Sequence, residues 1–231
     1  MKRFYKTVSV DGVDGGWEVR LDGRSVRSPA KAALVFRSQP LARAVAEEWE
    51  TQGEEIHPLS MPMMQLASTA VDVVGKNRAA IVDGVAKYAE TDLLCYRAEH
   101  PRELVERQAK AWQPLLDWAT LRYDAPLHVH AGLMPKPQPE DATRALRHAV
   151  DAHDDWTLSA LQSATAASGS LVVALALMEA RIDAAEAFAA SQVDETFQIE
   201  QWGEDPEAAK RREGLRLDIE AARRFVDLLR G

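Results

Sequence analysis

The residues best suited to chemistry lie in the stretch DETFQIEQWGED, residues 194–205, where five carboxylates occur within twelve positions. Phe197, Ile199 and Trp202 are interleaved with them. Carboxylates at this density could act as a general acid–base pair, as ligands of a calcium ion, or as the charged rim of a binding surface.

Catalysis and calcium binding both fit this stretch poorly. An acid–base pair needs one desolvated and one solvated acid, which is possible around Trp202, but no other reactive residue converges on it in sequence. A calcium loop needs oxygens at alternate positions around a glycine turn, and Phe197 and Ile199 occupy the wrong places. Two alternatives remain: a solvated helix face whose aromatic side chains enter the core, and an acidic binding surface with aromatic anchors. The residues alone favour the solvated face over the binding surface, and both over catalysis.

A second group of reactive residues surrounds the single cysteine, Cys95. Its neighbours Leu94 and Tyr96 predict a buried thiol that packs as a small hydrophobic side chain. Asp92 and Arg97 bracket it, and they could form either an ion pair or a recognition pair.

The remaining motifs predict no catalytic residues, no metal and no cofactor. His128 and His130 would share one face of a strand, but two imidazoles are too few for a closed zinc site, and no cysteine or acid lies close in sequence. The glycine-rich loops that hold nucleotides and dinucleotides are missing, as are the G-x-S-x-G and H-E-x-x-H signatures.

Composition limits the classes of partner that the chain can bind and the cellular compartment in which we expect it. The 231 residues carry a net charge of −8, which argues against nucleic acid and anionic membranes as partners. One cysteine permits no internal disulfide, and the N-terminus shows neither a signal peptide nor a transit peptide. We therefore expect a soluble cytoplasmic protein, or a mature chain from which a targeting segment has been removed. The uncharged stretch 157–178 is long enough to span a bilayer, but its first half is polar. We therefore expect a break at small residues followed by a buried core helix, and not membrane insertion.

The strands and helices that would position these residues can be predicted from the sequence, and together they indicate an α+β protein. Residues 1–60 form a small β-rich module: FYKTVSV and WEVRL alternate around the turn residues Asp14, Gly15 and Gly16, and a short strand is expected at 33–36. Residues 61–231 form a larger all-helical domain, apart from an extended segment at 93–96 and the linker-like PKPQP at 135–139. Helices are expected at 41–52, 62–73, 77–91, from 101, and at 140–153, 156–167, 170–181, 183–202 and from 206 onward.

Single residues also allow predictions about local structure. Pro114 should begin a new helix or kink the one that starts near 101, because it removes a backbone donor. Trp49, Trp112 and Trp118 lie at helical spacing beside apolar residues, and we expect them in the core.

Two long runs are recognisable. DETFQIEQWGEDPEAAKRR at 194–212 and YAETDLLCYRAEHP at 88–101 resemble the family of assembly chaperones for the α subunit of F₁ ATP synthase. Further segments agree in the same order: LDGRSVRSP at 21–29, LARAVAEEWETQ at 41–52, SMP at 60–62, QAKAWQPLLDW at 108–118 and SGSLVVALAL at 168–177. The resemblance covers nearly the whole chain. The absence of a targeting extension points to a bacterial-type member, whereas eukaryotic relatives would act in the mitochondrial matrix.

This resemblance implies a chaperone without catalysis that binds the free α subunit and shields its subunit interface until α pairs with β. It also implies a β-rich N-terminal module and a helical C-terminal domain, and we expect a monomer. Two alternatives stay open: a hydrolytic enzyme that uses the carboxylates of 194–205 in a pocket between the two modules, and a stable structural subunit of a larger complex.

The client surface is then expected in the two distinctive runs. We hypothesise that it contains Glu195, Gln198, Glu200, Trp202, Glu204 and Asp205, with Asp92 and Arg97 as further members.

Overall fold

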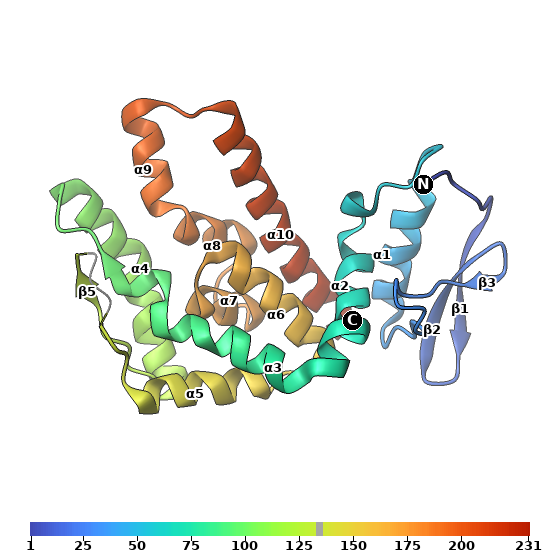
Figure 1. Ribbon diagram of the computed structural model, residues 1–231, viewed down its shortest axis with the longest axis horizontal. Helices are drawn as coiled ribbons and strands as arrows, with labels where there is room; N and C mark the ends of the chain where they lie inside the picture. The colour runs from blue at the N-terminus through green and yellow to red at the C-terminus, as the bar shows by residue number, and fades with distance from the viewer. Residues whose placement is uncertain (133–135) are drawn as a thin grey trace. The chain divides into compact units, whose positions relative to one another are not determined.

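The computed structural model describes residues 1–132 and 136–231 (Figure 1). A small antiparallel sheet near the N-terminus is followed by a mostly helical remainder. The predicted α+β class is therefore confirmed.

The sheet has the strand order β1-β2-β3 and follows from the predicted hairpin. Its strands are β1 (Val8–Val13), β2 (Gly16–Leu21) and β3 (Arg24–Ser25). Val10 lies opposite Val19, and the chain reverses at the expected turn residues. A side chain at Gly16 would place its Cβ 2.3 Å from the carbonyl oxygen of Phe36, so this close approach requires glycine. The strand expected at 33–36 is reduced to isolated bridges, such as the one between Phe36 and Trp17.

Ten α-helices carry most of the described residues. They are α1 (Gln39–Glu50), α2 (Pro62–Thr69), α3 (Gly75–Ala86), α4 (Arg102–Tyr123), α5 (Glu140–Asp151), α6 (Asp155–Ser168), α7 (Leu171–Met178), α8 (Ala184–Ser191), α9 (Val193–Trp202) and α10 (Pro206–Arg230). A π-helical segment, η2 (Ala70–Val74), follows α2, and 3-10 turns occur at η1 (Pro58–Ser60), η3 (Lys87–Thr91) and η4 (Leu93–Cys95).

The described chain divides into two compact units. The first contains Met1–Arg78, Asp155–Ala160 and Ala221–Gly231, and the second contains Ala79–Asp154 and Leu161–Glu220. The predicted division between residues 60 and 61 follows the change from strands to helices, and as a division into domains it stays a prediction.

The first unit is organised around aromatic contacts. Phe36 meets Trp156 edge-on with ring centroids 5.8 Å apart, and Trp156 stacks on Phe225 at 6.1 Å. Helix α1 packs on β1 and β2 with Leu41 and Val45, both without exposed surface. Residues from three distant parts of the chain therefore share one core.

The second unit is built around α7, whose eight residues are all fully buried. Helices α4 and α8 pack against α7, and α9 packs against α4. The helices expected at 156–167 and 170–181 are present as α6 and α7, and Gly169, which adopts a positive φ of 69°, makes the expected break between them. Within the described residues, no helix is both long and apolar enough to cross a membrane.

Two local predictions are wrong. Residues 183–202 form two helices, α8 and α9, because Gln192 between them leaves the helical region at φ −116° and ψ 20°. Residues 93–95 form a 3-10 turn instead of an extended segment, because Asp92 Oδ1 accepts a hydrogen bond from the backbone N–H of Leu94. Only β4 (Tyr96–Arg97) is extended, and it pairs with β5 (His130–Ala131) in parallel.

Other local expectations have mixed outcomes. Helix α4 continues through Pro114 as one element. Trp112 is fully buried as predicted, while Trp49 and Trp118 are only half-buried. In the linker-like run, Pro135 lies outside the described residues, and 136–139 has no regular secondary structure.

Candidate functional site

Helix α9 is fixed to α4 through its first turns. Gln108 Nε2 donates a 2.7 Å hydrogen bond to Asp194 Oδ1, and Phe197 is the one buried residue of α9. The guanidinium of Arg107 lies over the Phe197 ring, 5.3 Å from its centroid. These contacts determine which face of α9 is left to solvent.

The far end of α9 is exposed. The Trp202 side chain is 78% exposed, and Gln198 and Glu200 are exposed on the turn before it. The helix stops at Gly203, which has a φ of 84° and donates its N–H to the carbonyl of Ile199. A large aromatic side chain therefore stands in solvent at the end of a helix whose first turns contact α4.

The carboxylates around Trp202 do not converge. Glu200 Oε2 lies 2.6 Å from Arg107 Nη1, and Glu204 Oε1 lies 3.2 Å from Arg212 Nη1. Asp205 caps α10, since its Oδ1 accepts hydrogen bonds from the N–H groups of Glu207 and Ala208. Each of these three acids contacts a different partner. Two carboxylates that share one site, as an acid–base pair requires, are therefore not formed by them.

Glu195 stands apart from these three acids. It lines a small hollow of about 270 Å³ together with Asp194, Arg211 and Arg212. It is partly exposed, in the first turn of α9.

Asp92 has no exposed surface. Its Oδ1 accepts hydrogen bonds from Ser170 Oγ at 2.7 Å and from the N–H of Leu94 at 3.1 Å, and its Oδ2 accepts one from the N–H of Val172 at 3.1 Å. Complete burial raises the pKa of the Asp92 carboxyl, while these hydrogen bonds lower it. The residue holds the N-terminus of α7 in place and is fully buried, and its assignment to the client surface stays a prediction.

Arg97 is half-buried on β4. Its Nε donates a 2.9 Å hydrogen bond to the carbonyl of Leu94, and its guanidinium lies 5.2 Å from the centroid of the Trp112 ring. Burial lowers its pKa. Its buried Nη2 has no hydrogen-bond partner among the described residues, and it forms no ion pair with Asp92 there.

Cys95 and the histidines show no reactive arrangement. Burial raises the pKa of the Cys95 thiol to about 12, so it stays protonated at neutral pH. His128 and His130 lie with ring centroids 6.3 Å apart. Across 1–132 and 136–231, no group of three or more His, Cys, Asp or Glu side chains is placed to hold a metal ion.

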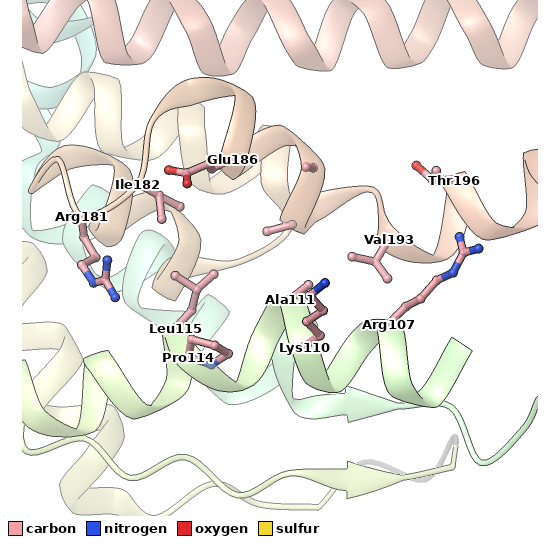
Figure 2. Close-up of a pocket in the computed structure, with 12 residues that line it drawn as sticks. Arg107, Lys110, Ala111, Pro114, Leu115, Arg181, Ile182, Glu186, Val193 and Thr196 are labelled. Atoms are coloured by element: carbon pink, nitrogen blue, oxygen red, sulfur yellow. The ribbon is translucent and has the colours of Figure 1, made fainter. Parts of the chain in front are cut away.

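A groove that the sequence did not indicate lies between α4 and the segment 181–196 (Figure 2). It has a volume of about 580 Å³ and mixes small apolar side chains with three cations, Arg107, Lys110 and Arg181. Its two walls are far apart in sequence, so no local motif marks it. The only available signal was the spacing of Arg107, Lys110 and Pro114 along one face of α4.

Comparison with known proteins gives one family. The model of the ATP12 chaperone protein family matches residues 2–120. The mitochondrial protein atp12 of Schizosaccharomyces pombe is 22% identical over 214 residues, which cover 87% of this chain and 74% of that protein.

Solved structures agree with this result. The crystal structure of Atp12 from Paracoccus denitrificans has a TM-score of 0.92 and 38% identity, with 99% of this chain and 98% of that chain covered. The Atu1473 protein of Agrobacterium tumefaciens has a TM-score of 0.93 and 39% identity, with 99% and 86% covered.

Proposed function

Because this chain belongs to the ATP12 family of F₁ ATP synthase assembly chaperones, we propose that it binds the free α subunit of F₁ ATP synthase until α pairs with β. A subunit made for a ring exposes partly apolar faces that aggregate when they are uncovered. The chaperone covers such a face, releases it to β, and catalyses no reaction.

The single observation that carries the proposed site is the exposure of Trp202. A tryptophan that is 78% exposed leaves a large apolar side chain in water, and tryptophan is among the residues that contribute most to binding at protein interfaces. The contacts of Asp194 and Phe197 with α4 hold its helix in place. Little ordering is then needed on binding, which favours affinity.

The residues around Trp202 supply the polar rim of the proposed surface. Its members are Glu195, Gln198, Glu200, Glu204 and Asp205. The four carboxylates would face arginine or lysine side chains of the client, with Glu200 and Glu204 sharing their charge between the client and their present partners, Arg107 and Arg212. Charged rims raise association rates and suppress wrong partners more than they add affinity. Such a surface suits a client that must later be released.

Two residues from the other distinctive run have different parts in this proposal. Asp92 has no exposed atoms, so its contribution is to hold the N-terminus of α7. Arg97 keeps part of its surface exposed and stays a candidate contact.

Size-resolved co-purification tests the proposed function. The tagged chain, expressed together with F₁ subunits, is expected to recover free α without β. Recovery of the assembled enzyme would instead identify a structural subunit, and absence of α even after mild crosslinking would contradict the proposal.

A matched pair of variants tests the site. Trp202→Ala should weaken α binding by about 30-fold, which corresponds to about 2 kcal/mol for loss of a central aromatic anchor. Leu121→Ala is the control, because Leu121 is a large apolar residue of α4 that is 88% exposed. If Trp202→Ala weakened the affinity for α no more than Leu121→Ala does, Trp202 would not be part of the client surface.

A further inference from the structure

The groove between α4 and 181–196 has an apolar floor made of small and branched side chains. Leu115 and Ala190 are buried at its base, and Ala111, Ile182 and Val193 are partly exposed above them. Figure 2 shows Leu115, Ile182 and Val193 projecting into the space between the two walls. Such a floor can receive apolar side chains of a partner, and the alanines allow a close backbone approach.

The rim of the groove is cationic, although the chain as a whole carries a net charge of −8. Arg107 and Arg181 lie toward opposite ends of the groove in Figure 2, with Lys110 between them. Arg107 is neutralised by Glu103 and Glu200, at 2.7 and 2.6 Å.

Lys110 and Arg181 differ from Arg107, because both are exposed and neither forms an ion pair or a side-chain hydrogen bond with any residue that the structure describes. The only acid of the lining, Glu186, already accepts a hydrogen bond from the N–H of Asp183 in the capping box of α8. The groove therefore presents two cations that form no ion pair among the described residues, against a single acid in its lining.

We propose that this groove binds an acidic, amphipathic segment of the α subunit, an inference that rests on the proposed function. Apolar side chains of the segment would lie on Ile182 and Val193, and its carboxylates would pair with Lys110 and Arg181. A volume of about 580 Å³ is within the range of pockets that enclose a small ligand, so the groove holds one short stretch of the client and not a whole face.

The groove is also continuous with the acidic end of α9. Val193 and Thr196 line it, and the Arg107–Glu200 ion pair joins its rim to the exposed turn that carries Trp202. The chaperone would therefore recognise the client through two contacts of opposite charge. Basic side chains of the client would lie near Trp202, and acidic side chains of the client would lie in the groove. This arrangement determines the orientation of the bound segment more sharply than a uniformly acidic surface would.

Charge reversal at the two unpaired cations tests this inference. The double variant Lys110→Glu/Arg181→Glu should lower α binding at least tenfold. The control Arg102→Glu/Arg144→Glu changes the net charge equally at exposed cations of α4 and α5 outside the groove, and it should change binding less than twofold. Thermal melting of all four proteins, with Trp202→Ala included, checks that they are folded.

The outcomes separate this inference from the proposed function. If the unmodified chain binds α and Trp202→Ala weakens binding while the groove variant does not, the groove inference is overturned and the proposed function stands. If the unmodified chain fails to bind α, the proposed function itself fails.

A photo-crosslinking residue at Ala189, which is exposed beside the groove, identifies the occupant. Mass spectrometry of the product formed with free α should locate the crosslink in a segment rich in Asp and Glu. A crosslink to a basic segment of α, to a second copy of this chain, or to nothing would overturn the assignment.

Discussion

The hydroxyl of Ser170 donates a 2.7 Å hydrogen bond to the carboxylate of Asp92, which ties the turn before β4 to the N-terminus of α7. The backbone N–H of Val172 donates to the other oxygen of the same carboxylate. An anion at a helix N-terminus is stabilised by the helix dipole and by the free N–H groups there. A residue in one of the most distinctive runs of the sequence therefore serves folding directly.

Removing this carboxylate should cost stability. Asp92→Ala leaves the donors of Leu94, Ser170 and Val172 buried without an acceptor, and we expect the free energy of unfolding to fall by about 2–4 kcal/mol. Urea unfolding measures the change. Ser170→Ala removes one of these donors and the side-chain acceptor of the Val173 N–H, but it should cost less, because Asp92 keeps its hydrogen bonds from Leu94 and Val172. If Asp92→Ala kept full stability but lost α binding, Asp92 would belong to the client surface instead.

Reversing the charge of Glu195 should affect binding more than folding. Glu195→Lys places a cation in the first turn of α9, which costs about 0.3–1 kcal/mol through the helix dipole and lowers the thermal midpoint by only a few degrees. Affinity for α should fall about tenfold, as measured by titration with the purified subunit. Glu106→Lys, an exposed reversal on α4, is the control. A variant that no longer folds would make Glu195 a structural residue.

Two substitutions at Asp205 separate its charge from its capping role. Asp205→Asn keeps a side-chain acceptor for Glu207 and Ala208, so the stability of α10 should change little, whereas Asp205→Ala should cost about 1 kcal/mol. If the charge of Asp205 contacts the client, both variants should weaken α binding to a similar degree. Weaker binding by Asp205→Ala alone would show that only the helix cap matters.

Glu48 should make the stability of the chain depend on pH. Its two oxygens accept hydrogen bonds from the N–H groups of Met63 and Met64, at 2.7 and 2.9 Å, yet burial outweighs them and raises its pKa from 4.5 to about 7. The folded state then binds a proton more tightly than the unfolded state between these two values. Stability from this group should therefore rise as the pH falls from 8 toward 5.

Urea unfolding at pH 8, 7, 6 and 5 checks this sign. On acidification, the original chain should gain on the order of 1–2 kcal/mol relative to Glu48→Gln, after allowance for the partial exposure of the carboxyl. A difference between the two proteins that does not change with pH would show that Glu48 stays ionised throughout.

Local sequence patterns determined much of the secondary structure of this protein. Alternation around Asp14 and Gly15 predicted the hairpin, and periodicity predicted most helices, because both signals arise between residues that are close in sequence. The break at Gln192 was missed, since neither glycine nor proline marks it and the loss of helical φ and ψ is confined to one residue. The two long runs were sufficient to indicate the family.

Only the tertiary structure decided what each polar residue in those runs does. Asp92 and Glu195 are both carboxylates in distinctive runs, but one is enclosed by the N-terminus of α7 and the other lines a small hollow at the start of α9. The groove exists because Lys110 and Arg181, 71 positions apart (181 − 110), are brought to the same rim when α4 and α8 pack around α7. Burial and charge pairing depend on neighbours that are distant along the chain, and these are set only when the helices pack.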